Sequence, residues 1–310
     1  MRLVVAGTPS VALPSLATLV ASKHEVVAVL TRPDAARGRR RTPVPSEVGA
    51  WALERGIPVL RPQHPRDPEF VAALAALAPD ACPVVAYGAL LPASVLQIPT
   101  FGWINLHFSL LPRWRGAAPV QRAIMAGDEV TGATTFRIVG ALDAGPVYDT
   151  VTRPLDGTEI AGDLLEELAV SGADLLLRTI DRLPTTDPTP QPGGPAALAP
   201  RLTVAEARLD WTRPAEDLDR LIRGCAPAPG AWTQVAGTRF RVLYARPVAG
   251  EDLPPGQLRI EKKRVLVGTG TAALELVRLQ PQGRPAMAGA DWGRGLREAP
   301  VAFDSADQGI

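Results

Sequence analysis

Three polar side chains in the first half of the chain have the chemistry needed for acyl transfer to an amine. Asn105 and His107 are two residues apart in the apolar run 103–108, so on a strand both side chains leave the same face. Asp143 lies in the sequence ALDAGP, between two further strand-like segments. Acyl transfer needs a base for the amine proton and donors for the developing oxyanion. An imidazole, a carboxylate and an amide together supply both.

Each of these residues also has an ordinary structural explanation. A strand histidine can be a hydrogen-bonded core residue beside a turn asparagine, and an aspartate before glycine and proline is common in turns. The position of the run favours a functional site. It ends at Ser109-Leu110-Leu111-Pro112, and ligands of open α/β sheets bind at the carboxyl ends of the strands.

The elements that must position these residues have the pattern of a doubly wound α/β domain. Buried parallel strands are predicted at four apolar runs, residues 3–6, 25–31, 83–87 and 103–108. A helix is predicted at 69–78, and the apolar spacing over 158–183 predicts a long amphipathic helix with Thr158 as its N-cap. We therefore expect a Rossmann-like, mostly parallel sheet.

A proline-rich segment marks the end of this domain. Residues 184–200 contain six prolines, which oppose a helix or a central strand and predict an extended connector. We place a first domain at 1–183, a linker at 184–204 and a second domain at 205–310. The second domain has one predicted helix, at 215–224, and short alternating segments divided by glycine and proline. A small β-barrel or sandwich is expected there.

Composition excludes several classes of protein. Lys and Arg number 33 against 32 Asp and Glu, so any contact with nucleic acid must come from local clusters. The sequence contains no apolar run of membrane-spanning length and no signal-peptide pattern, which predicts a cytoplasmic protein. His24, His64 and His107 lack the spacing of metal ligands, so no bound metal is expected. The single glycine of AGTPS, residues 6–10, disfavours a dinucleotide site.

Two local basic clusters could contact phosphate groups. They are Arg39, Arg40 and Arg41, within the proline-rich stretch 32–46, and Lys262, Lys263 and Arg264 in the second domain. The stretch 32–46 has neither a strand nor a helix pattern, which predicts a surface loop. Such cations suit contacts to an RNA backbone, although a solvated charge run and an exposed hairpin turn are their ordinary explanations.

The order of motifs resembles the methionyl-tRNA formyltransferase family over nearly the whole chain. INLHFSLLPRWRGAAPVQRAI, residues 104–124, is similar to the signature NxHxSLLPxxRG of folate-dependent formyltransferases. The other motifs that match in order are AGTP at 6–9, the loop RPDAARGRRRTPVPS at 32–46, PVVAYGALLP at 83–92, LDAGP at 142–146, EARLDW at 206–211 and PAPGAW at 227–232.

This resemblance implies formyl transfer from 10-formyltetrahydrofolate to the amino group of methionyl-initiator tRNA. Asn105, His107 and Asp143 would be the catalytic trio, and whether His107 or Asp143 is the direct base stays open. The implied folate contacts are Ser109, Leu110, Leu111 and Pro112 and, on the pterin side, Ala86, Tyr87 and Gly88.

The resemblance also implies how the tRNA is held. Arg39, with Arg40 and Arg41 beside it, would meet the acceptor end, and an OB-like second domain would hold the backbone through Lys262, Lys263 and Arg264. We expect a monomer. The alternative is another 10-formyltetrahydrofolate-dependent enzyme, such as a sugar-amine N-formyltransferase, which shares the trio but commonly lacks this arginine-rich loop together with such a barrel.

Overall fold

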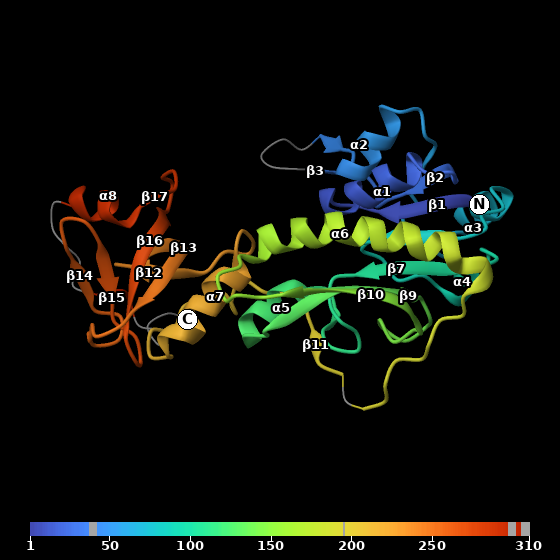
Figure 1. The fold of residues 1–310 in the computed structure, drawn as a ribbon. Coiled ribbons are helices and arrows are strands. Elements are labelled where there is room, and N and C mark those ends of the chain that lie inside the picture. Colours follow the sequence, from blue (N-terminus) through green and yellow to red (C-terminus); the bar gives the residue numbers. More distant parts are fainter. Residues whose placement is uncertain (37–41, 195, 297–301, 305–310) are drawn as a thin grey trace. The chain divides into compact units, whose positions relative to one another are not determined.

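The computed structural model describes residues 1–36, 42–194, 196–296 and 302–304, which form two compact units (Figure 1). The first unit consists of Met1–Pro119, Val130–Pro154 and Leu165–Ala199. The second consists of Val120–Glu129, Leu155–Leu164 and Pro200–Ile310. Among the described residues, no helix is both long enough and apolar enough to cross a membrane.

The first unit is built on a seven-stranded sheet of order β10-β9-β7-β6-β1-β2-β5. Its strands are β1 (Arg2–Gly7), β2 (Glu25–Leu30), β5 (Val59–Leu60), β6 (Cys82–Val85), β7 (Trp103–His107), β9 (Val130–Arg137) and β10 (Val147–Pro154). The strands β5, β2, β1, β6 and β7 pair in parallel. The strand β9 is antiparallel to both of its neighbours, β7 and β10. The four predicted strands and the doubly wound fold class are confirmed.

The helices lie between and beside these strands. They are α1 (Leu13–Val20), α2 (Glu47–Leu53), α3 (Pro68–Ala76), α4 (Ala93–Leu96) and α6 (Ala161–Arg182), with 3-10 turns η1 (Ser10–Ala12) and η2 (Leu183–Thr185). The helix α5 (Pro119–Ala126) belongs to the second unit from Val120 onward. Figure 1 shows α6 running along the sheet. A Cβ on Gly172 of α6 would lie 2.8 Å from Leu106 Cδ2, so this glycine lets the helix lie close against β7.

The predicted N-cap of α6 is wrong. The Thr158 hydroxyl and backbone N–H both donate to Asp156 Oδ1, at 2.6 and 2.8 Å. These bonds close a local turn on the aspartate, and the helix begins three residues later, at Ala161. A short polar side chain that caps a turn and one that caps a helix look alike in sequence.

The carboxyl edge of the parallel strands contains a topological switch point. From β1 the sheet continues through β2 and β5 on one side and through β6 and β7 on the other. The Thr8 hydroxyl, just after β1, donates to the Tyr87 carbonyl, just after β6, at 2.7 Å. Ligands of open α/β sheets bind outside such a point, so this edge is where a site is expected.

The stretch 32–46 differs from the patternless loop predicted for it. Its described part contains the two-residue strands β3 (Ala35–Ala36) and β4 (Pro43–Val44), which pair in antiparallel fashion. Two residues are too few to show the alternation that identifies a strand. Arg39, Arg40 and Arg41 lie outside the described residues.

The proline-rich segment is extended, as predicted, and it adds short strand pairs to the first unit. Thr189 and Val147 exchange backbone hydrogen bonds of 2.7 Å. Further along, β11 (Leu198–Ala199) pairs in parallel with β8 (Arg115–Gly116), which begins three residues after the last residue of the SLLP motif. A Cβ on Gly116 would lie 2.6 Å from the Ala199 carbonyl oxygen, so the glycine of the RG motif permits this pairing.

The second unit is a six-stranded antiparallel sheet that curls into a half-barrel (Figure 1). Its elements are α7 (Ala215–Cys225), β12 (Trp232–Val235), β13 (Thr238–Val248), β14 (Leu258–Ile260), β15 (Val265–Val267), β16 (Ala273–Pro281), β17 (Met287–Ala288) and α8 (Gly289–Arg294). Helix α7 confirms the predicted helix and packs on β13 through buried residues that include Leu218, Ile222 and Val242.

Candidate active site

The strand β7 brings two of the predicted catalytic residues to the carboxyl edge of the sheet. Asn105 pairs with Phe136 and His107 with Thr134 on the neighbouring strand β9. The His107 side chain is only 7% exposed, and Asn105 is half-buried. The two lie on one face of the strand, as the spacing predicts.

The hydrogen bond of His107 determines which of its nitrogens is available for chemistry. Nε2 lies 2.8 Å from the Trp114 carbonyl oxygen, which can only accept, so Nε2 carries the proton. In the neutral ring Nδ1 then has a free lone pair. Nδ1 lies 3.8 Å from Asp143 Oδ2.

Burial sets the charge of this imidazole. It lowers the pKa of His107 below 6.5, and the nearby Asp143 carboxylate and the bond to Trp114 oppose that effect without cancelling it. The ring is therefore neutral near pH 7 and can accept a proton.

Asp143 reaches this histidine from the loop between β9 and β10. Its Oδ2 accepts the Gly116 backbone N–H at 2.7 Å. The loop then turns tightly at Gly145, where a Cβ would lie 1.7 Å from the Arg137 carbonyl oxygen. The glycine of LDAGP is thus required by direct contact of the loop with β9.

The segment Ser109–Pro112 forms a turn that is fixed from β9. The Ser109 hydroxyl donates to the Arg113 carbonyl at 2.6 Å. The Thr134 hydroxyl donates to the Ser109 carbonyl at 2.7 Å and accepts from the Leu111 N–H at 3.3 Å. Leu110, Leu111 and Pro112 stay half-buried, which leaves part of their apolar surface open.

The other predicted folate contacts directly follow β6. Ala86 and Gly88 are exposed and have positive φ angles of 49° and 83°. Tyr87 is 2% exposed and packs in the core of the first unit, so at this segment only its neighbours present surface to a ligand.

The second predicted basic cluster lies between β14 and β15, in the second unit. Lys262 and Lys263 are exposed. The Arg264 guanidinium is held by Glu251 at 2.8 Å and by Glu261 at 2.7 Å. Two acidic partners neutralise much of its attraction for phosphate, so the lysines are the more available cations of the cluster.

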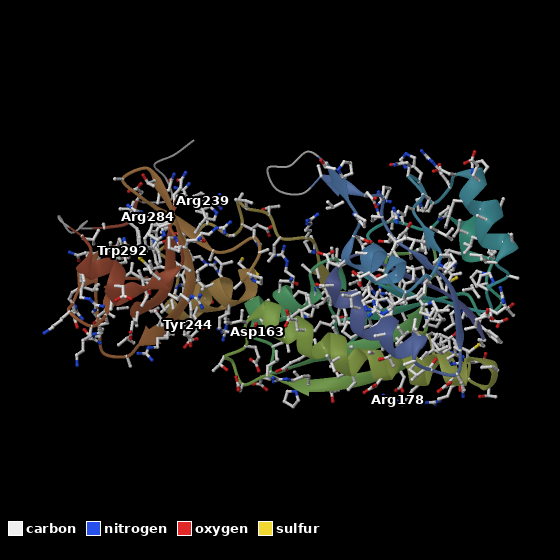
Figure 2. The ribbon with its side chains drawn as sticks, turned by 90° about the horizontal axis from the view of Figure 1, so that it is seen from above. Asp163, Arg178, Arg239, Tyr244, Arg284 and Trp292 are labelled. Atoms are coloured by element: carbon white, nitrogen blue, oxygen red, sulfur yellow. The ribbon has the colours of Figure 1, made fainter. Side chains whose placement is uncertain are left out.

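A further basic surface on β12 and β13 was not predicted. The Trp232 ring lies under the guanidiniums of Arg239, 4.4 Å away, and Arg208, 5.5 Å away. Arg241, two residues after Arg239, is exposed and pairs with Trp232 across the strands. Figure 2 shows Arg239 and Arg284 in the same part of this unit. The alternation of TRFRV was the available signal, since it places two arginines on one face.

Other contributors to the site carry no signature of their own. Trp114 acts through its backbone carbonyl, and Thr134 is one of several small residues of a buried strand. Gln191 lies in the linker and donates to the carbonyls of Asp143 and Gly145. A polar residue in a proline-rich connector gives no reason to connect it with a catalytic loop.

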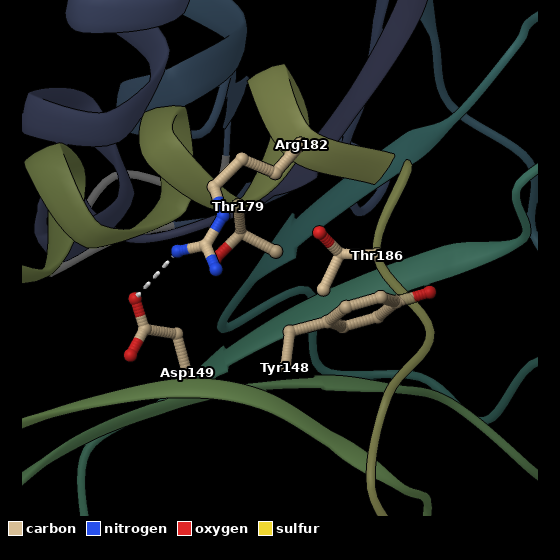
Figure 3. Close-up of a pocket in the computed structure, with 5 residues that line it drawn as sticks. All are labelled: Tyr148, Asp149, Thr179, Arg182 and Thr186. Atoms are coloured by element: carbon tan, nitrogen blue, oxygen red, sulfur yellow. Dashed lines mark ion pairs between the residues drawn. The ribbon is translucent and has the colours of Figure 1, made fainter. Parts of the chain in front are cut away.

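A small pocket lies elsewhere in the first unit, between β10 and α6 (Figure 3). It is lined by Tyr148, Asp149, Thr179, Arg182 and Thr186, and Arg182 pairs with Asp149 at 3.7 Å. Its volume of about 10 Å³ has room for about one water molecule, and none of the predicted site residues lines it. Within the described part of the chain, no group of three or more His, Cys, Asp or Glu could hold a metal ion.

Comparison with known proteins matches both units. Residues 1–180 match the formyl transferase family and residues 201–297 match the formyl transferase C-terminal domain. The chain is 58% identical to the methionyl-tRNA formyltransferase of Thermobifida fusca over 300 residues, which cover 96% of this chain and 97% of that protein.

Two solved structures share the fold. The methionyl-tRNA formyltransferase from Clostridium thermocellum has a TM-score of 0.56 at 16% identity, covering 81% of this chain and 95% of that one. HypX from Aquifex aeolicus, solved in complex with tetrahydrofolic acid, has a TM-score of 0.63 at 18% identity. That match covers 97% of this chain and 48% of the longer HypX chain.

The α/β unit and the β unit that follows it, each matched by its own family, define a two-domain formyltransferase. The full-length relatives make this more specific. The chain belongs to the methionyl-tRNA formyltransferase family.

Proposed function

We propose that the protein transfers the formyl group of 10-formyltetrahydrofolate to the α-amino group of methionyl-initiator tRNA. The observation that carries the proposal is the pair of His107 and Asp143 at the carboxyl edge of the sheet, with Nδ1 facing the carboxylate. The high identity to a methionyl-tRNA formyltransferase supports the choice of acceptor.

The proposed proton acceptor is His107 Nδ1. An attacking amine must lose a proton, and Nδ1 is the nitrogen that is not already bonded to hydrogen. The imidazolium that forms would be stabilised by Asp143, 3.8 Å away, and by the Trp114 carbonyl. It would return the proton to N10 of the departing tetrahydrofolate as the bond between the formyl carbon and N10 breaks. We therefore propose His107 as the direct base, with Asp143 acting through the histidine.

Asn105 and the protonated ring would stabilise the negative charge that develops on the formyl oxygen. The Asn105 amide has N–H donors, and it leaves β7 on the same face as His107. Donors placed before the reaction cost no reorganisation when the charge appears. This makes the two residues of β7 complementary, one for the proton and one for the oxygen.

We propose that the folate binds at this edge of the sheet. The half-buried Leu110, Leu111 and Pro112 offer apolar surface, and the exposed backbone at Ala86 and Gly88 offers polar groups beside it. Flat heteroaromatic ligands bind in sites of this composition, apolar with a few fixed polar groups. Ser109 and Tyr87 would support these contacts from within, since both are buried.

For the tRNA we propose backbone contacts on the second unit. Exposed Lys262 and Lys263 and the Trp232–Arg239–Arg241 surface supply cations, and an aromatic ring among arginines suits a nucleic acid. We keep Arg264 as a weaker contributor and Arg39, Arg40 and Arg41 as contacts to the acceptor end. We further propose a monomer that works in the cytoplasm, where charged tRNA is used.

The test is a formyl-transfer assay with 10-formyltetrahydrofolate and four acceptors: methionyl-initiator tRNA, methionyl-elongator tRNA, free methionine and a nucleotide-linked amino sugar. Transfer confined to the initiator tRNA, and lost in His107→Asn, is the expected result. Transfer to an amino sugar in place of the tRNA would reject the proposed acceptor and support the alternative formyltransferase.

A further inference from the structure

Asp143 lies in a loop that is open to solvent. Its φ of +45° is in the left-handed region, and the preceding Gly140, Ala141 and Leu142 are exposed, Leu142 by 57%. A non-glycine residue keeps such a conformation when the surrounding structure holds it. The groups that hold this loop therefore decide where the carboxylate stands relative to His107.

Gln191 is bonded to the loop on both sides of its turn. Its Nε2 donates to the Asp143 carbonyl at 2.8 Å and to the Gly145 carbonyl at 2.7 Å. Its Oε1 accepts from Arg115, at 2.6 Å from Nη2 and 3.1 Å from Nε. The reverse amide orientation would place N–H groups against Arg115 and an oxygen against two carbonyls, so these partners fix it.

These bonds close a ring around the carboxylate. Arg115 holds Gln191, Gln191 holds the Asp143 carbonyl, and the N–H of Gly116, the residue after Arg115, donates to Asp143 Oδ2 at 2.7 Å. The side chain of Asp143 is thus held by Gly116, and its backbone carbonyl is held by Gln191, which is itself bonded to Arg115.

Gln191 is itself anchored on both sides. Before it, Thr189 exchanges two backbone hydrogen bonds with Val147, and after it, the Arg115 N–H donates to the Ala197 carbonyl at 3.1 Å. Because the chain is fixed before and after Gln191, its side-chain amide has a fixed position and can hold the loop to which it is hydrogen-bonded.

We propose that Gln191 is a positioning residue for Asp143, and that the segment leading out of the first unit thereby sets the distance between the carboxylate and His107. The proposal rests on the proposed function, because it concerns the geometry of the formyl-transfer site. It assigns to the linker a part in catalysis besides connecting the two units.

Two substitutions of Gln191 distinguish its bonds to the Asp143 loop from its bond to Arg115. Gln191→Met keeps the length of the side chain and removes the donors and the acceptor. Gln191→Glu keeps an acceptor for Arg115, removes the N–H donors to the loop and places a negative charge against the two loop carbonyls. Thr189→Ala is the matched control, because the Thr189 side chain is exposed in the same segment and the Val147 contact uses its backbone.

The first readout is kinetic. In both Gln191 variants we expect kcat to fall by roughly 10- to 100-fold with the KM for both substrates nearly unchanged, since a misplacement of about 1 Å costs on this order. Thr189→Ala should match the parent protein. An unchanged kcat in folded Gln191 variants would overturn the proposal.

The second readout needs no activity. The chain has three histidines, so the His107 ring can be assigned by comparison with His107→Asn, and its pKa can be followed by nitrogen NMR. Asp143 is the charged group that raises this pKa, and the Trp114 carbonyl is the ring's other polar partner. Gln191→Met, which adds no charge, should lower the pKa of His107 as the Asp143 carboxylate moves away.

The two readouts keep the proposals apart. A lower melting temperature with an unchanged His107 pKa would show that Gln191 only stabilises the fold, and would overturn its positioning role. A parent protein that fails to formylate methionyl-tRNA, while Gln191→Met still lowers the His107 pKa, would reject the proposed function and support the positioning of Asp143.

Discussion

His107 and Trp114 are joined by a hydrogen bond of 2.8 Å from Nε2 to a main-chain carbonyl. The bond uses no side chain of Trp114, so only the path of the loop, which has a φ of +62° at this residue, provides it. It orients the ring and selects its tautomer. The proton-accepting nitrogen is consequently the one that faces Asp143.

Replacement of His107 by Asn should lower kcat/KM for formyl transfer by roughly 10²- to 10⁴-fold, the usual contribution of a general base. Asn retains a polar side chain but cannot take the proton. His64→Asn is the control, because that side chain is exposed on the same unit. Equal activity of the two variants would contradict the assigned role.

The acid limb of the pH profile of kcat/KM should have its midpoint below 6.5, because burial lowers the pKa of His107. Activity is then full above this pKa and lost as the pH falls through it. Asp143→Asn removes the charge that raises the pKa, so its limb should move to lower pH. A limb that moves upward would show that another group titrates.

The same group links pH to stability. Unfolded His107 has the ordinary pKa near 6.5, and the folded value is lower, so below about 6.5 the unfolded state binds more protons. The free energy of unfolding should therefore decrease as the pH falls from there to the folded pKa. This decrease should be smaller in His107→Asn, measured by urea unfolding at several pH values.

Gly145→Ala should destabilise the first unit by roughly 1–3 kcal/mol or more and lower kcat, because its Cβ would overlap the Arg137 carbonyl. Gly140→Ala, in the same loop, has no neighbour within 4 Å and should change the free energy of unfolding by less than about 0.5 kcal/mol. The free energies of unfolding of the two variants, measured by urea unfolding, test this difference. Similar values would mean that the loop moves aside freely.

Arg241→Ala and Arg239→Ala should weaken binding of initiator tRNA, and each lost phosphate contact should reduce the slope of log K against log salt by about 1. Lys262→Ala with Lys263→Ala tests the other cluster in the same way. Arg178→Ala removes one exposed charge from α6 and should leave the slope unchanged. Binding measured at several salt concentrations separates these cases.

Much of the fold could be predicted because its signals are local. The apolar runs of β1, β2, β6 and β7 are continuous, and α7 has a clear amphipathic pattern. The spacing of Asn105 and His107 identified one face of one strand. That Asp143 meets this face could not be read from periodicity, because it depends on the tight turn at Gly145.

The remaining site residues escaped prediction for a physical reason. Trp114 contributes a carbonyl, which every residue has, and Gln191 contributes an amide whose partners lie 46 and 48 residues away in sequence. The start of α6 was misplaced because Thr158 caps its own turn. Such contacts depend on the tertiary fold, which brings segments that are distant in sequence together, and a local sequence pattern does not record them.

The pairing of β8 with β11 bears on how this enzyme can be dissected. A fragment that stops at Arg182, where the long helix ends, would contain every residue of the trio. It would nevertheless lack Gln191 and the carbonyls of Ala197 and Ala199, which accept from the Arg115 and Ala118 amides. A truncation that is meant to keep the backbone contacts of this segment therefore has to extend at least through Ala199, and a shorter chain leaves the Arg115 and Ala118 amides without these carbonyls.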